Sequence, residues 1–180
     1  ILAAAGAPSA MQFIAGNVSG EAHLTGLPKA LQGGGRLNLL DGKIADQPAE
    51  LAQVDFKLDG QKVLLEKLEA RLLQSGLVAR GELDLEKKSY QISGAAQQVA
   101  LDRLAEALEL TQAEVKGAAD ATFNVSGSFD RVEDLRVELT AQAANVNVNG
   151  RDSGDLKLTA RTDPSGRIDA ELMTGLFVAA

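Results

Sequence analysis

The protein has 180 residues, a formal net charge of −7, 45% hydrophobic residues, only 3% aromatic residues and no cysteine. This hydrophobic content excludes a wholly disordered chain, and the acidic balance argues against partners that attract basic surfaces, namely nucleic acids and anionic membranes. Without cysteine there is no disulfide, zinc–thiolate site or cysteine nucleophile. No apolar stretch approaches the roughly 20 residues that span a bilayer.

The opening "ILAAAGAPSAM" has no charged start, so it does not predict a signal peptide. We expect the chain to be an excerpt of a longer protein or a processed product, with any membrane anchor or targeting segment outside it.

Strict alternation of apolar and polar residues predicts β-strands through the first half of the chain. The connections are short, which predicts an antiparallel meander. Val63, Leu64 and Leu65 interrupt the alternation, as a bulge or a sheet end would. The alternating apolar positions are Val18, Gly20, Ala22, Leu24, Leu37, Leu39, Val54, Phe56, Leu58, Leu68, Ala70, Leu72, Leu77, Ala79, Gly81, Leu83 and Leu85.

One segment follows a helical period. Leu101, Leu104, Ala105 and Leu108 are spaced i, i+3, i+4, i+7, which predicts a short amphipathic helix over residues 101–109. Such a helix is too short to be stable alone, so we expect it to lie on an apolar surface.

Alternation resumes after the predicted helix. Asn149-Gly150 and Asp163-Pro164-Ser165-Gly166 predict turns between strands. We therefore expect a first meander over about 10–100, a helix over 101–109 and a second meander over about 113–175, forming a single segment over 1–180. The alternating apolar positions here are Ala119, Ala121, Phe123, Val125, Leu135, Val137, Leu139, Ala141, Ala143, Leu156, Leu158, Ala160, Ile168, Ala170 and Leu172.

No constellation of catalytic residues stands out. Phosphate-binding and nucleophile-elbow motifs are absent, and His23, the only histidine, lies on the polar side of its strand. The carboxylates, including Asp55, Glu82 and Glu171, occur at strand-face spacing amid opposite charges. We interpret them as cross-strand partners of Lys57, Arg80, Arg167 and their neighbours. We expect no enzyme activity, cofactor or metal.

The continuous apolar face has two interpretations. It packs against a second layer, as in an ordinary structural or adhesive β-module. Alternatively, the sheet curls and the face lines a groove that holds flexible acyl chains, because exposed apolar patches need a cover or a ligand. The candidate groove residues are Val54, Phe56, Leu58, Leu77, Ala79, Leu83, Ala121, Phe123, Val125, Leu135, Val137, Leu139, Val146, Val148, Leu156, Leu158, Ile168 and Leu172.

The order of elements resembles a known family. A meander, the step "AQQVALDRLAEAL" into a short helix, and the restart "VKGAADATFNVSGSF" are similar to the TamB family of translocation and assembly module proteins, and to the wider AsmA-like group. The resemblance covers about residues 35–175.

The resemblance implies a mainly β fold, a long curled antiparallel β-meander with an apolar interior and one short amphipathic helix. It implies a periplasmic bridge of a diderm bacterium, tethered to the inner membrane by a segment outside this chain. Such a bridge shields phospholipid acyl chains on their way to the outer membrane and partners a BamA-like outer-membrane barrel.

Overall fold

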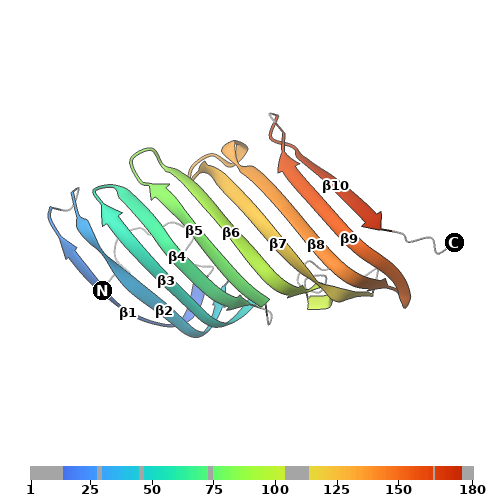
Figure 1. The fold of residues 1–180 in the computed structure, drawn as a ribbon. Helices are drawn as coiled ribbons and strands as arrows, with labels where there is room; N and C mark the ends of the chain where they lie inside the picture. The colour runs from blue at the N-terminus through green and yellow to red at the C-terminus, as the bar shows by residue number, and fades with distance from the viewer. Residues whose placement is uncertain are drawn as a thin grey trace.

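The computed structural model describes residues 14–27, 30–44, 47–72, 75–103, 114–163 and 165–175. These form one ten-stranded antiparallel sheet in which the strands lie in the order of the sequence (Figure 1). The predicted antiparallel meander is therefore confirmed. The strands are β1 (Ile14–Thr25), β2 (Gln32–Ile44), β3 (Gln47–Asp59), β4 (Lys62–Leu72), β5 (Ser75–Asp84), β6 (Ser89–Ala100), β7 (Val115–Ser128), β8 (Arg136–Val148), β9 (Arg151–Thr162) and β10 (Ile168–Gly175).

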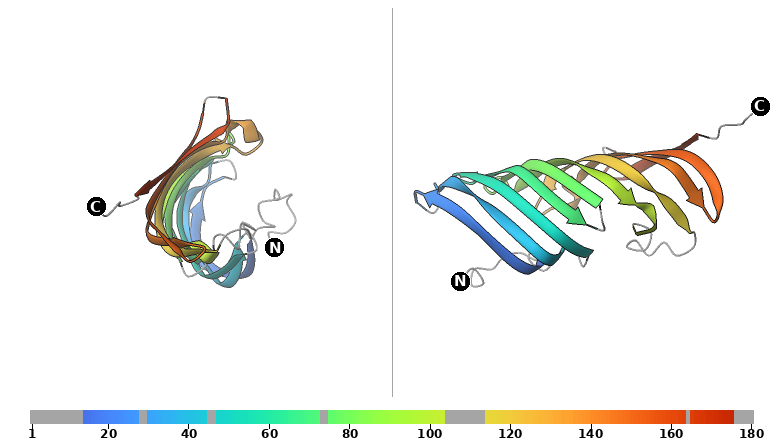
Figure 2. Two further views of the ribbon diagram at one scale, coloured as in Figure 1. Left: turned by 90° about the vertical axis from the view of Figure 1, so that its right-hand side faces the viewer. Right: turned by 60° about the horizontal axis from the view of Figure 1, so that its bottom comes forward.

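The sheet is a single, weakly curled layer. The end-on view shows the bent strands stacked behind one another (Figure 2). Extensive contacts join consecutive strands, and one smaller set joins β7 to the 3-10 helix η2 (Val132–Asp134). Within the described ranges, no helix is long and apolar enough to cross a membrane.

The turns use the residues that the sequence indicates. Asn149 and Gly150 both have positive φ, 52° and 79°, as the two-residue turn between β8 and β9 requires. In the next turn Gly166 has φ of 84° and donates its N–H to the Asp163 carbonyl at 3.0 Å. These geometries set the pairing of β8 with β9 and of β9 with β10.

Two local predictions fared differently. Residues 101–103 are helical as predicted, and the rest of the predicted helix, 104–109, lies outside the described residues. The extension of the fifth strand to Leu85 was wrong, because β5 ends at Asp84 and Leu85 lies exposed in the following turn. The Asp84 carboxylate accepts the Lys87 N–H at 2.8 Å, which favours a turn at this point.

Bulges keep the apolar residues of three strands on one face. In β4 the register shifts between Leu65 and Leu68, so one extra residue is inserted there. Without it, the alternation that places Val63 and Leu65 on the apolar face would place Lys67 and Glu69 there too. The interruption in the alternation is therefore a bulge rather than a sheet end.

The bulges in β6 and β8 are supported by carboxylates. Gln98 and Asn145 have positive φ values of 53° and 54° at these bulges. The Gln98 N–H donates to Asp120 Oδ1 on β7 at 2.9 Å, and the Asn145 N–H donates to Asp155 Oδ1 on β9 at 3.3 Å. An adjacent strand thus satisfies an amide that the ladder leaves free.

The buried core is small and lies on the apolar face. One cluster consists of Leu39, Ala52 and Ala70, and the other of Ala119, Ala143 and Val146. Leu101, which directly follows β6, packs against the second cluster.

The bulge in β6 gives a test. Asp120→Ala should lower the free energy of unfolding by about 1 kcal/mol, because the Gln98 amide loses its acceptor. Asp120→Asn keeps an acceptor oxygen and should restore most of this stability. Urea unfolding would measure both variants, and equal stability of Asp120→Ala and the wild type would contradict the assignment.

Candidate functional site

Uncharged rows of side chains cross the whole sheet on one face. The register pairs Gly20 with Leu37, Leu37 with Val54, and so on through every strand. From β1 to β10 this row reads Gly20, Leu37, Val54, Leu68, Ala79, Gly94, Phe123, Leu139, Ala160 and Ala170. The adjacent row reads Val18, Leu39, Ala52, Ala70, Leu77, Ala96, Ala121, Ala141, Leu158 and Leu172. Neither row contains a charged or hydrogen-bonding side chain.

The candidate groove residues lie in these two rows or at other positions of the strands whose side chains point to the same face. Phe56 and Val125 belong to a third row, and Leu58 and Leu83 to a fourth. Val146 and Val148 share the face because of the bulge in β8. Leu135 precedes β8, two residues before Val137. The structure therefore brings the predicted residues together on one face, which we call the apolar face.

The sequence analysis missed the contribution of β6. Tyr90, Ile92, Gly94 and Ala96 continue the four rows between β5 and β7. Their alternation with Gln91, Ser93 and Gln97 is the signal that could have identified this strand. It is weak, since glycine and alanine contribute little hydrophobicity.

The aromatic side chains of Phe123 and Tyr90 lie against glycines of a neighbouring strand. A Cβ built on Gly94 would meet Phe123 Cζ at 2.6 Å, and one built on Gly127 would meet Tyr90 Oη at 3.0 Å. These glycines leave room for the rings to lie across the sheet.

The apolar face is partly open. The interior side chains of Leu39, Ala52 and Ala70 are buried, and most other members of the rows are half-buried. At the outer strands the apolar face becomes exposed, with Val18 at 60%, Ile168 at 64% and Leu172 at 60%.

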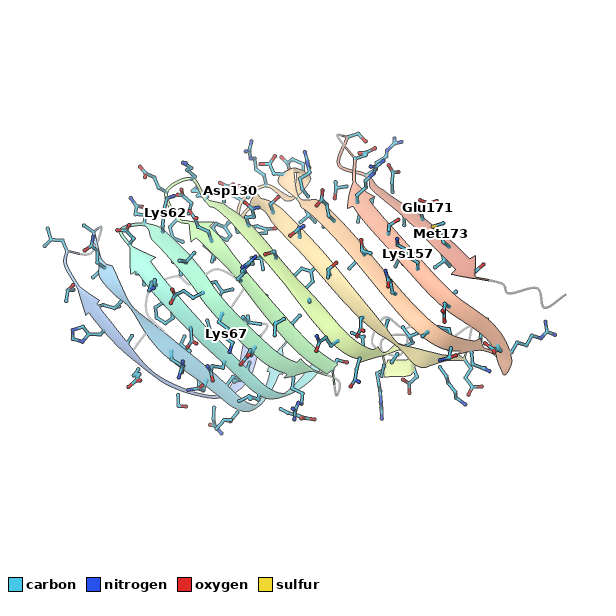
Figure 3. All side chains as sticks on the ribbon, viewed as in Figure 1. Lys62, Lys67, Asp130, Lys157, Glu171 and Met173 are labelled. Atoms are coloured by element: carbon cyan, nitrogen blue, oxygen red, sulfur yellow. The ribbon has the colours of Figure 1, made fainter. Side chains whose placement is uncertain are left out.

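The opposite face carries the charged side chains, together with exposed apolar ones such as Leu40, Val78 and Met173. Arg36 makes a two-point ion pair with Asp55, with Nε–Oδ1 and Nη2–Oδ2 distances of 2.5 and 3.1 Å. Lys62 Nζ lies 2.9 Å from Glu82 Oε1, linking β4 and β5. Lys67, Lys157 and Glu171 are further members of this face, on strands spread across the sheet (Figure 3).

This arrangement confirms the interpretation of Asp55 and Glu82 as cross-strand partners, with changes of partner, whereas no ion pair is found for Glu171 among the described residues. Asp55 pairs with Arg36 and Glu82 with Lys62, neither of which the sequence analysis named. Lys57 pairs with Glu66 at the β4 bulge. Across the described ranges, no three histidine or carboxylate side chains gather as a metal site would require, and His23 is exposed.

Comparisons with protein-family models, curated proteins and solved structures found no match to this chain.

The ion pairs predict acid sensitivity. The hydrogen bond from Arg36 lowers the pKa of Asp55, and the Lys87 N–H does the same for Asp84. A carboxyl whose pKa is lower in the folded state contributes stability above its unfolded pKa of about 4 and loses that contribution as pH falls through its folded pKa.

Unfolding in urea should therefore need less denaturant at pH 3 than at pH 6. Asp55→Asn should reduce this difference, because it removes one of the groups that protonate. An unchanged pH difference in Asp55→Asn would show that this pair does not contribute to it.

Proposed function

We propose that this chain is a segment of a periplasmic bridge that shields acyl chains along its apolar face. In this role it carries phospholipids between the inner and outer membranes of a diderm bacterium and supports outer-membrane assembly. The inner-membrane tether and a BamA-like barrel as partner follow from the resemblance to the TamB family. We propose no catalytic role and no cofactor or metal.

The observation that carries the proposal is the continuity of the uncharged rows through all ten strands. A charged side chain in the path would repel a hydrocarbon chain, and a hydrogen-bonding one would hold water there. Neither interrupts the two complete rows. Alkyl chains need no directional contact, so a lining of Leu, Val, Ala and Gly suits them.

The length of the rows favours a path rather than a pocket. Neighbouring strands lie about 4.8 Å apart, so a row across ten strands extends for roughly 43 Å. One acyl layer of a bilayer is only about 15 Å thick. An acyl chain would thus cover about a third of the row, and could move along it without meeting a charge.

The weak curl is consistent with acyl chains on the inner side of the sheet. Along β7, Ala121, Phe123 and Val125 are half-buried, and Thr122 and Asn124 between them are exposed. We place the apolar face on the inner side of the curl and the head group at its open rim, in water.

Site-specific photo-crosslinking tests which face meets lipid. A crosslinking residue at Phe123 or Leu139 should capture lipid in cells, whereas one at Asn124 or Glu138 should not, because adjacent strand residues point to opposite faces. The lipid adducts would be measured by mass spectrometry of the purified chain. Capture at all four positions, or at none while lipid transport continues, would refute the proposal.

A charge placed in the row tests transport. Leu139→Arg should impair lipid passage, since a charge in an apolar lining is costly unless it is paired. Glu138→Arg is the matched control on the polar face and should leave transport intact. Both variants should fold, because an open face lets a long side chain reach water.

The same pair of variants separates the proposal from a structural β-module. If a second layer packs on the apolar face, Leu139→Arg should misfold, and no position should capture lipid. Circular dichroism and urea unfolding would detect that outcome.

A further inference from the structure

The apolar face is not equally accessible along the length of its strands. On β2, Leu37 is 41% exposed, whereas Leu39, two residues further along the same face, is 6% exposed. On β8, Leu139 is half-buried, whereas Ala143 and Val146 are 8% and 0% exposed. On both strands the buried residues lie toward the side of the sheet where β6 passes to β7, which we call the lower side (Figure 1).

Leu101 packs on the buried cluster at the lower side of β7 and β8. This cluster consists of Ala119, Ala143 and Val146. The other partly buried side chains that pack against it belong to β7, β8 and β9 themselves, whereas Leu101 follows the last residue of β6. Leu101 therefore brings to the cluster an apolar side chain from outside the strands that form it.

Backbone features of β7 and β8 set Val146 beside Leu101. Gly117 on β7 has φ of 137°, a conformation that favours glycine. A Cβ built on Gly117 would lie 3.5 Å from Leu101 Cδ1 and 3.5 Å from Val146 Cγ2, so both side chains border this bare position. The bulge at Asn145 turns Val146 onto the apolar face, and Asp155 accepts the hydrogen bond that supports the bulge.

We propose that Leu101 closes the lower side of the apolar face over β7 and β8, so that an acyl chain runs along the upper rows, through Phe123 and Leu139. This inference rests on the proposed function and deepens it, because it states which rows carry lipid. A side chain with no exposed surface, such as Val146, touches a ligand only if its cover moves. Moving Leu101 away would expose apolar surface to water, which opposes the movement. Leu101 is thus a positioning residue for the acyl chain.

The composition of the lower side would not by itself keep an acyl chain out. An uncharged row also crosses β6 to β9 there, and it reads Val99, Ala119, Ala143 and Leu156. These side chains are as apolar as those of the upper rows. The difference between the two sides is therefore one of cover rather than polarity, and a substitution of the covering side chain tests it directly.

The test uses the whole chain and phosphatidylcholine vesicles that contain a phospholipid with a diazirine on one acyl chain. On irradiation the diazirine forms a carbene, which inserts into C–H bonds and so labels alanine and valine as well as phenylalanine. Mass spectrometry of peptides would locate the adducts. We expect adducts on Phe123 and Leu139, and none above background on Ala119, Ala143 or Val146.

Two variants separate a covering role from a merely structural one. Leu101→Ala removes most of the cover and should extend labelling to Ala143 and Val146, because their surfaces become accessible. Leu101→Met is the matched control, since it keeps an apolar side chain of similar volume and should leave the labelling unchanged. Hydroxyl-radical footprinting without lipid gives an independent measurement: oxidation of Val146 should rise in Leu101→Ala and stay at background in Leu101→Met.

Adducts on Ala119, Ala143 or Val146 in the wild type would overturn this inference and leave the proposed function intact. Unchanged labelling in a folded Leu101→Ala variant would also overturn it, because Leu101 would then contribute stability without directing lipid. The absence of adducts at every position would instead refute the proposed function, and this inference with it. If circular dichroism shows that Leu101→Ala does not fold, the wild-type labelling pattern decides alone.

Discussion

The structure depends on one constraint, the strict alternation of side chains across each strand combined with a fixed antiparallel register. A slip of one residue in any strand would turn its charged side chains onto the apolar face. The rows remain uncharged only because all ten strands turn their alternating apolar residues to the same face. In β4, β6 and β8 the alternation of apolar and polar residues shifts by one position along the sequence. A bulge at each shift returns the apolar residues to the same face.

The polar face reinforces this register. Ion pairs between β2 and β3 and between β4 and β5 join side chains that are directly opposite each other or close to it. Exposed pairs contribute little stability, but a slipped register would place some like charges together. The charges thus favour the native register over slipped ones more than they add to the stability of the sheet. Asp120 and Asp155 hold the bulges in place by accepting hydrogen bonds from their amides.

The sheet also keeps its core modest. Among the described side chains, four of the six buried apolar residues are alanines, so little hydrophobic surface is buried at any one point. Stability is distributed along the ladders, and each strand depends mainly on its two neighbours, as in repeat proteins. Such a layer is extended by adding strands, and its apolar face grows with it.

The sequence alone determined which residues of a strand share a face, because side-chain alternation is a local property with a period of two. It likewise determined the turns at Asn149-Gly150 and Gly166, where positive φ favours particular residues. The alternation by itself therefore places candidate groove residues such as Phe123 and Leu139 on one face of their strands. What only the tertiary structure decided was the phase between strands and the position of β6. These depend on partners far away in the sequence, as Gln98 depends on Asp120 and Lys62 on Glu82. A bulge changes the phase of a strand by one residue, and its location is fixed by hydrogen bonds to a neighbouring strand that no local pattern contains.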